Sequence, residues 1–303
     1  MKIVEYKTGH EERLAKLKVT LSNPLSLCWQ VTKKCNYSCP FCLSGEQDQV
    51  DLPFSKIKSI INVLAESNLL RIDFTGGEPF LRSDFCKILT YASEKGIETL
   101  ITSNGSIWSE KIASTLLATN TLLLISLDGD EEIHDKSRGK GAYSKAVENI
   151  KRYRDAGIPL RINYLIRKDN VDKIDYVHQL VKDLRIDRLF FILIAPQGKA
   201  FTNTELLLSD KERVFYLNRI KELKRISGDH PFITIQDYSE LGNHHSCFLI
   251  DSKGDVISQG YSQDDCIKVG NILTDGLGKC WNNPVVNHKG HFLQYSYMFN
   301  YYM

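Results

Sequence analysis

Six apolar segments alternate with amphipathic segments over most of this 303-residue chain, and the alternation restricts its possible folds. The apolar segments are rich in Ile, Leu, Val and Phe, as is typical of strands buried on both faces. The expected strands are Leu25–Val31, Leu70–Thr75, Glu98–Thr102, Thr121–Leu127, Leu160–Ile166 and Arg188–Ile194. Strands alternating with helices predict an α/β fold with a parallel sheet and outer helices. Because six units are two short of a closed (β/α)8 barrel, we expect a partial (β/α)6 TIM-type barrel, open on one side.

The expected helices begin and end at recognisable residues. They cover roughly Ser55–Ser67, Ser83–Lys95, Ser109–Leu117, Tyr143–Ala156, Val171–Leu184 and Ser209–Ile226. A serine begins four of them, where its hydroxyl could accept a bond from an unpaired backbone N–H. These expected N-caps are Ser55, Ser83, Ser109 and Ser209. Gly96 and Gly157 follow two of the helices, where a residue in the left-handed conformation is expected.

The pattern changes after Gly228, where scattered cysteines and the short strand-like pieces Phe232–Tyr238 and Asp255–Gln259 replace the long helices. We therefore place a domain boundary near residue 229. The barrel would cover residues 25–228, and a small α+β domain would cover residues 229–303. The polar residues 1–24 are expected to form an extension over the barrel.

Charge and hydropathy restrict the surroundings of the chain. It has 39 basic and 37 acidic residues and no long basic run, so we expect neither nucleic acid nor a membrane as a partner. The N-terminus lacks an apolar signal core, and the longest apolar stretch, Leu122–Leu127, is too short to span a bilayer. We expect a cytoplasmic protein. In such a protein the eight cysteines are more often metal ligands or catalytic groups than disulfides.

Three of these cysteines, Cys35, Cys39 and Cys42, follow the first expected strand with the spacing C-x3-C-x2-C. Thiolates at this spacing on a tight loop could bind three irons of a cubane cluster and leave the fourth iron open. A structural zinc site would instead take four ligands in two pairs. Zinc binding and plain structural thiols remain the alternatives for this motif.

The second expected strand ends in Gly76-Gly77-Glu78-Pro79. Adjacent glycines would let the backbone approach a ligand closely, and Glu78 could accept a bond from an ammonium group. Other strands end in the turns Thr102-Ser-Asn-Gly, Ser126-Leu-Asp-Gly and Pro196-Gln-Gly. Because the C-terminal ends of barrel strands meet at one rim, we expect these turns to gather there with the cysteine loop.

Taken together, the cysteine loop, the aromatic Phe41 before its last cysteine and the Gly-Gly-Glu turn resemble the radical S-adenosylmethionine (SAM) family. The resemblance continues over residues 25–195. It includes Ser103-Asn104-Gly105, Ser126-Leu127-Asp128-Gly129, His134-Asp135 and Arg138-Gly139. This combination is typical of the branch of the family with a twitch or SPASM C-terminal domain.

The resemblance implies a [4Fe-4S] cluster on the three cysteines and SAM on its open iron. It implies a cofactor-binding set formed by Phe41, Gly76, Gly77, Glu78, Pro79, Asn104, Ser126, Asp128 and Arg138. Arg138 could clamp a carboxylate with two parallel bonds, whereas Asp128 and His134 could simply cap loops. Reductive cleavage of SAM would give a 5′-deoxyadenosyl radical that takes a hydrogen atom from a substrate. An electron donor such as flavodoxin or ferredoxin is also implied.

The C-terminal cysteines, Cys247, Cys266 and Cys280, allow several interpretations. The surrounding residues resemble the twitch pattern, but Gln259 stands where the family often has a cluster ligand. The three cysteines could bind an auxiliary iron–sulfur cluster with an open iron that binds substrate. His244 or His245 could also be its fourth ligand. They could equally be buried apolar residues. Cys247 could also return a hydrogen atom to a substrate radical, which would make the reaction an epimerisation.

The expected activity follows from the branch of the family. Many of its members modify ribosomally made peptides, so peptide modification is the main expectation. Many peptide maturases carry an N-terminal leader-peptide recognition domain, but only about 24 residues precede the first strand here, too few for one. This counts against a peptide substrate without excluding it, since such a domain can be a separate protein. The alternatives are oxidation or epimerisation of a sugar, an aminoglycoside or another small molecule, and viperin-like nucleotide chemistry. A non-catalytic iron–sulfur or zinc-binding module is the rival from another class.

Overall fold

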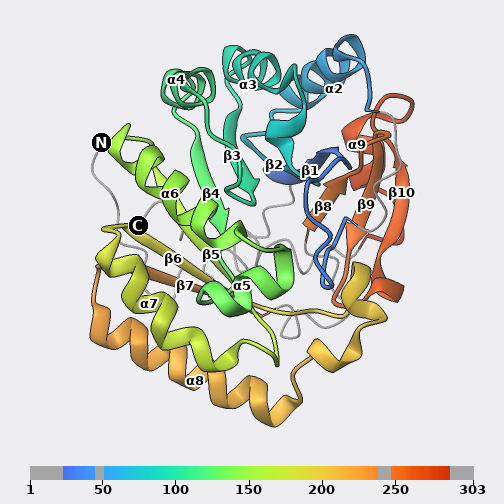
Figure 1. Ribbon diagram of the computed structural model, residues 1–303. Coiled ribbons are helices and arrows are strands. Elements are labelled where there is room, and N and C mark those ends of the chain that lie inside the picture. Colours follow the sequence, from blue (N-terminus) through green and yellow to red (C-terminus); the bar gives the residue numbers. More distant parts are fainter. Residues whose placement is uncertain (1–22, 45–50, 238–246, 287–303) are drawn as a thin grey trace.

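A ten-stranded sheet surrounded by helices makes up the part of the chain that the computed structural model describes, residues 23–44, 51–237 and 247–286 (Figure 1). The strands are β1 (Ser26–Thr32), β2 (Arg71–Gly76), β3 (Glu98–Ser103), β4 (Leu122–Ser126), β5 (Leu160–Ile166), β6 (Arg188–Leu193), β7 (Phe232–Gln236), β8 (Cys247–Ile250), β9 (Asp255–Gln259) and β10 (Ile267–Asn271). All six predicted strands are confirmed, with ends that differ by at most one residue. Most of the predicted N-terminal extension lies outside the described residues.

The helices follow the strands along the chain and cover the outside of the sheet (Figure 1). They are α2 (Phe54–Glu66), α3 (Phe85–Glu94), α4 (Glu110–Ala118), α5 (Glu131–Arg138), α6 (Ala142–Asp155), α7 (Ile174–Asp183), α8 (Asp210–Ser227) and α9 (Gly276–Trp281). Helix α5 was not predicted, whereas α9 lies where the resemblance to the twitch pattern implies a short helix. Helix α5 buries only His134 and Ser137, so its sequence has no apolar stripe to indicate a helix. None of the described helices is long and apolar enough to cross a membrane.

Two of the four predicted serine caps are confirmed. Ser109 accepts from the N–H of Ile112, and Ser209 forms a capping box with Glu212. The predictions for Ser55 and Ser83 are wrong because Pro53 and Asp84 occupy the two N-cap positions. The carbonyl of Pro53 already accepts from the N–H groups of Lys56 and Ile57, which places Ser55 inside the first turn. Gly96 and Gly157 have φ values of 77° and 78°, as predicted for left-handed residues after a helix.

Strands β1 to β7 are all parallel to their neighbours. We had placed Phe232–Tyr238 beyond the domain boundary, yet β7 pairs with β6, with Arg188 opposite Phe232. On the other edge, β8 pairs in parallel with β1 and leads into the antiparallel strands β9 and β10 (Figure 1). Among the described strands β7 and β10 form the two edges, so the barrel is open as predicted. The boundary near residue 229 remains a prediction.

Alternation along the strands gives the barrel an apolar outer face and a polar inner face. In β2, Ile72 and Phe74 belong to the core between sheet and helices, whereas Arg71 and Asp73 line a cavity inside the barrel. Strand β5 repeats this pattern, with Arg161 and Asn163 on the inner face. Successive side chains of a strand point to opposite faces. The helices therefore stabilise the sheet from outside, and the inside is left for polar groups.

Candidate active site

A cavity of about 570 Å³ occupies the inside of the barrel. Its rim end is formed by the cysteine loop and by the turns that follow β2, β3, β4 and β6, so the predicted gathering of these turns at one rim is confirmed. Of the residues predicted to bind the cofactor, those that line the cavity are Phe41, Gly76, Gly77, Asn104, Ser126, Asp128 and Arg138. Glu78 and Pro79 are buried and do not line it.

The three thiols of the cysteine loop, Cys35, Cys39 and Cys42, are half-buried and all line the cavity. Burial raises the pKa of Cys35 and raises that of Cys39 to about 11, and the neighbouring thiols act in the same direction. Iron would reverse this effect because it binds thiolates. Three soft donors on one short loop at the mouth of a cavity are the donor set that a cubane with one open iron requires. The residues present therefore fit such a cluster.

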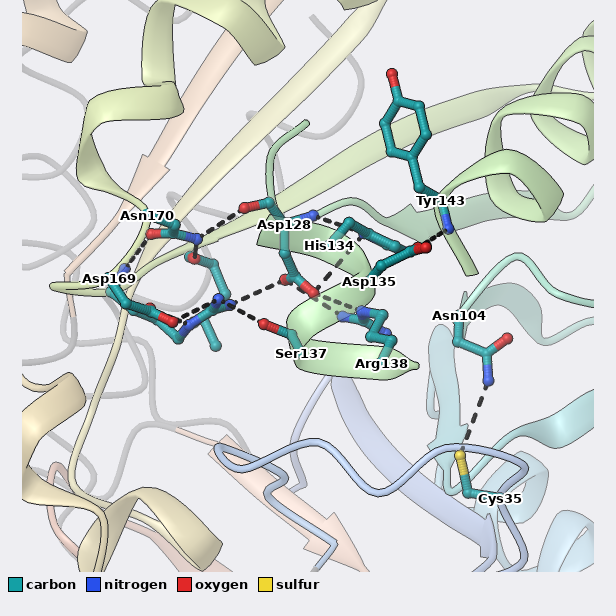
Figure 2. Close-up of polar contacts among 12 residues, drawn as sticks. Cys35, Asn104, Asp128, His134, Asp135, Ser137, Arg138, Tyr143, Asp169 and Asn170 are labelled. Carbon is teal, nitrogen blue, oxygen red and sulfur yellow. Dashed lines mark hydrogen bonds and ion pairs between the residues drawn. The ribbon is translucent and has the colours of Figure 1, made fainter. Parts of the chain in front are cut away.

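The described residues contain no group of three or more His, Cys, Asp and Glu side chains that could hold a single metal ion. In a cubane each cysteine binds a different iron, so the thiols of such a loop need not meet at one point. Asn104 contributes to this environment by donating from Nδ2 to the sulfur of Cys35 at 3.8 Å (Figure 2).

The two glycines after β2 are required by the cysteine loop itself. A Cβ on Gly76, which has φ of +147°, would lie 2.1 Å from the backbone oxygen of Thr32. A Cβ on Gly77 would lie 2.1 Å from the backbone oxygen of Lys34. The N–H of Gly77 donates to Thr32 O at 2.8 Å, and that of Glu78 donates to Lys34 O at 2.7 Å. The close approach that these glycines permit is thus to the backbone leading into the cysteine loop.

Glu78 connects the turn after β2 with the turn after β3. Its carboxylate accepts from the hydroxyl of Ser103 at 3.0 Å and from the backbone N–H groups of Asn104 at 2.7 Å and Phe80 at 3.2 Å. Burial raises the pKa of Glu78 to about 7, although these hydrogen bonds act in the opposite direction. Its contact with the amino group of SAM remains a prediction, because the partners found for its carboxylate are other rim residues.

Asp128 lies at the centre of a buried ionic network (Figure 2). Arg138 donates from Nε to Oδ2 at 2.5 Å, and Arg167 donates from Nη1 to Oδ1 at 3.1 Å. Burial alone would raise the pKa of Asp128, but the guanidinium groups of Arg138 and Arg167 lower it far below its usual range. The same guanidiniums lie 5.9 Å and 4.0 Å from the ring centre of Phe41. The network therefore packs directly on the cysteine loop.

His134 and Asp135 have local structural partners. The Nδ1 atom of His134 accepts from the backbone N–H of Asp128 at 3.1 Å, which confirms the loop-capping alternative for this histidine. Burial lowers the pKa of His134 to about 4, so the ring is neutral near pH 7 despite lying 3.9 Å from the Asp128 carboxylate. Asp135 accepts from the N–H of Gly141. It also accepts from the N–H of Tyr143 at the start of α6 (Figure 2).

Arg167 was missed by the sequence analysis. It is fully buried, and besides Asp128 it donates to Asp169 Oδ1 and Ser137 Oγ, each at 2.9 Å. Asn170, close to it in sequence, donates to the backbone oxygen of Asp128 at 3.0 Å. A signal was present, because Arg167 directly follows the predicted strand Leu160–Ile166 and so stands at the rim.

The segment after β6 holds the other side of the cysteine loop. Gly198 has φ of +55°, and a Cβ there would lie 2.4 Å from the backbone oxygen of Cys42. The N–H of Lys199 donates to that same oxygen at 2.9 Å. The side-chain amide of Asn203 donates to Pro40 O at 2.6 Å. Backbone contacts of this kind fix the position of the loop without using its thiols.

The structure does not bring two of the C-terminal cysteines together. Cys280 is fully buried in the core, and its sulfur would lie 2.7 Å from a Cβ on Gly270. Cys266 is half-buried and donates to the backbone oxygen of Ser262 at 3.4 Å. Position 266 directly precedes β10 and is four residue steps from position 270, or about 13 Å of extended chain. This placement suits the buried-thiol alternative for Cys280.

The side chain of Cys247, and both His244 and His245, lie outside the described residues, so the auxiliary cluster remains a prediction.

Comparison with known proteins identifies the family. The model of the Radical SAM superfamily matches residues 29–181. The mycofactocin maturase MftC of Mycolicibacterium smegmatis is 30% identical over 276 residues, which are 84% of this chain and 69% of the relative. The Fe-coproporphyrin III synthase of Methanosarcina barkeri is 28% identical over 221 residues, which are 70% of this chain and 55% of that relative.

Among solved structures, SuiB of Streptococcus suis bound to its precursor peptide SuiA has the same fold, with a TM-score of 0.73 and 18% identity. The alignment covers 92% of this chain and 69% of SuiB. The predicted partial barrel with a twitch- or SPASM-like C-terminal unit is confirmed. The matched family consists of enzymes that use a [4Fe-4S] cluster and SAM. This chain belongs to the radical SAM superfamily.

Proposed function

We propose that this radical SAM enzyme modifies a peptide. The observation that carries the proposal is the similarity to the maturase MftC, which is 30% identical over 84% of the chain. The fold shared with SuiB, a protein solved together with its precursor peptide, supports it. A separate protein that binds the leader of such a peptide is a further proposed partner. We further propose a cytoplasmic location and an electron donor such as flavodoxin or ferredoxin.

We assign the cofactor site to the rim end of the cavity. Cys35, Cys39 and Cys42 would hold the cluster, since they form the donor set at its mouth. When bound and reduced, the cluster and SAM supply a 5′-deoxyadenosyl radical that can take a hydrogen atom from a substrate. The residues of the chain would orient the substrate below this point and keep water out of the barrel.

Arg138 is the residue we assign to the carboxylate of SAM. Asp128 engages its Nε and Nη2 atoms, which orients the guanidinium beside Phe41 at the rim. The same side chain lines the cavity, so its remaining nitrogen, Nη1, could donate to a carboxylate there. Asn104 and Ser126 line the cavity nearby and could bind other polar groups of SAM.

A second candidate is chemistry on a small molecule such as a porphyrin. The similarity to the Fe-coproporphyrin III synthase favours it. A cavity of about 570 Å³ is also within the usual size of small-molecule sites. Coverage does not separate the two candidates, because a heme synthase of Methanosarcina barkeri is 26% identical over 88% of this chain. The peptide proposal ranks first because MftC has the higher identity, 30% over 84% of this chain.

The test has two parts. Protein reconstituted anaerobically with iron and sulfide should form 5′-deoxyadenosine from SAM and dithionite, and a variant with Cys35, Cys39 and Cys42 all replaced by Ala should not. Peptides encoded beside the gene should then change mass when added to the active protein. A change in coproporphyrin III with no change in any such peptide would favour the second candidate and refute the first.

A further inference from the structure

Strands β5, β6 and β7 lie side by side, and their inner face forms one wall of the cavity (Figure 1). Asn163 on β5, Phe190 on β6 and Thr234 on β7 are successive partners in the register of these strands. Gln236, two residues after Thr234, is the register partner of Ile192. We call these residues, all of which line the cavity, the β5–β7 wall. Because neighbouring strands are about 4.8 Å apart, the polar groups on β5 and β7 are about 10 Å apart, with an apolar strip on β6 between them.

Asn163 presents a hydrogen-bond donor to the cavity. The residue is only 7% exposed, and its Oδ1 atom accepts from Nε of Arg161 at 2.9 Å. This bond fixes the orientation of the amide, so that Nδ2 points away from Arg161. No residue of the described chain accepts from Nδ2, and this atom is not enclosed by protein. The donor is therefore held in place by the chain and is left for a ligand.

Thr234 and Gln236 supply further hydrogen-bonding groups on the other side of β6. Both are half-buried, and neither side chain has a hydrogen-bond partner among the residues that the structure describes. A glutamine amide contains a donor and an acceptor, and a hydroxyl can act as either. By contrast, the charged Arg71 and Arg161 of the cavity already have partners. The groups that a ligand could satisfy on this wall are therefore neutral.

A peptide backbone is the complement of such a wall. Each peptide group has a carbonyl that Asn163 could bind and an N–H that the oxygen of Gln236 could accept. An extended chain advances about 3.3 Å per residue, so peptide groups three residues apart would reach both sides of β6. Phe190 and Ile192 would provide the apolar surface between them, as ligand sites generally do. A carboxylate would fit less well, because it has no N–H to donate to Gln236.

We propose that the β5–β7 wall binds the backbone of the substrate peptide. Nδ2 of Asn163 donates to one peptide carbonyl, and the amide of Gln236 bonds to a second peptide group across β6. This inference rests on the proposed function, since it names the part of a peptide that the enzyme recognises. Ser126 on β4, which we assign to SAM, is the register partner of Asn163. The first of these peptide groups would therefore lie beside the SAM site, where a hydrogen atom would be taken.

Backbone recognition can be tested without knowing the natural substrate. Two pools of N-acetylated, C-terminally amidated hexapeptides, randomised over uncharged residues, would be incubated with the reconstituted, SAM-loaded full chain and analysed by affinity selection and mass spectrometry. In the second pool, esters replace alternate backbone amides. An ester keeps the length and shape of the amide but has no N–H and a weaker carbonyl acceptor. We expect about tenfold greater retention of the amide pool, as for the loss of one or two hydrogen bonds.

Variants separate binding by Asn163 from its bond to Arg161. Asn163→Asp has the same shape and can still accept from Arg161, but it replaces the free donor with an acceptor. Retention of the amide pool should fall about tenfold, whereas a residue that only held Arg161 in place would tolerate the change. Gln236→Met removes the second amide at similar length and should reduce the preference for amides over esters about fivefold. Asn218→Asp is the matched control, since Asn218 is exposed on α8.

Iron content and circular dichroism would show that each variant is folded, and Gln236→Met decides the question if Asn163→Asp is not. Equal retention of the two pools by wild type, or unchanged retention in folded Asn163→Asp, would overturn the inference and leave a peptide substrate in place. An equal loss of SAM affinity in Asn163→Asp would place the amide in the SAM site and overturn it as well. Retention of neither pool by wild type that forms 5′-deoxyadenosine would instead refute the peptide substrate, and the inference with it.

Discussion

Replacing Asp128 with Asn removes one negative charge from between two buried guanidiniums. The amide keeps the shape of the carboxylate and can still accept one hydrogen bond. It cannot balance Arg138 and Arg167, which lie 2.5 Å and 3.1 Å from the carboxylate oxygens. Loss of one partner from a buried ion pair costs about 3–5 kcal/mol, because the remaining charge is left uncompensated. We expect a decrease of this size in the free energy of unfolding, out of a total of about 5–15 kcal/mol.

Asp130→Asn is a matched control two residues away. Asp130 caps α5 by accepting from the N–H of Ile133, and Asn is an equally good N-cap. Its pair with Lys173 at 3.1 Å is partly exposed and worth at most about 1 kcal/mol. Urea unfolding of the apo proteins, followed by circular dichroism under anaerobic conditions, gives both free energies. A loss below about 1 kcal/mol in Asp128→Asn, or a loss equal to that of the control, would refute the role given to the network.

The pH dependence provides a second test of the same network. The pKa of Asp128 is lowered in the folded protein, so its stabilising effect is complete above the unfolded value of about 3.9 and disappears as pH falls towards the folded value. The difference in unfolding free energy between wild type and Asp128→Asn should therefore be constant above about pH 5 and decrease below about pH 4. A difference that persists unchanged into acid would show that the charge is not its source.

Three further predictions concern the rim and the C-terminal unit. Glu78→Gln should reduce the pH dependence of the unfolding free energy. The pKa of the Glu78 carboxyl is raised to about 7 in the folded protein, so wild type loses stability as pH rises from about 4.5 to 7. Parallel curves of unfolding free energy against pH for variant and wild type would contradict this. Gly77→Ala should lower the iron content after reconstitution, because its Cβ would lie 2.1 Å from a backbone oxygen at the start of the cysteine loop. Gly96→Ala, where nothing lies within 4 Å, should keep it; equal iron in both would count against the packing argument. Cys39→Ala should abolish SAM cleavage. Cys280→Ala should leave the iron content unchanged, and a loss of iron in this variant would indicate that Cys280 is a cluster ligand.

The barrel could be predicted from the sequence because its strands are buried on both sides. Ile72 and Phe74 pack against the helices, and even the polar Arg71 on the other face is hardly exposed. Strand β7 was recognised as strand-like but was separated from the barrel, because the loss of the helix–strand alternation after Gly228 resembled the end of a domain. Pairing of β7 with β6 is a contact across the whole length of α8, and no local pattern indicates it.

The contacts of the rim side chains were harder to predict than their location. Position at the end of a strand placed Glu78 and Asp128 at the rim, but only the fold decides what each carboxylate meets. Glu78 meets the hydroxyl of Ser103, 25 residues away, and Asp128 meets Arg167, 39 residues away. Partners at such separations depend on the register of three or more strands. A motif can therefore indicate where a residue lies and still leave its partner open.

The cysteine loop is held by turns that the resemblance assigned to SAM and by residues that it did not. Gly77 packs on the backbone at its start, Phe41 lies against the guanidinium of Arg167, and Gly198 packs on the backbone of Cys42 at its end. Each of these contacts is made by protein atoms alone. Loss of SAM cleavage in a variant of these turns would therefore not distinguish lost SAM binding from a displaced cluster loop. Iron content, measured before SAM affinity, separates the two effects, because a displaced loop would lose iron whereas a missing SAM contact would not.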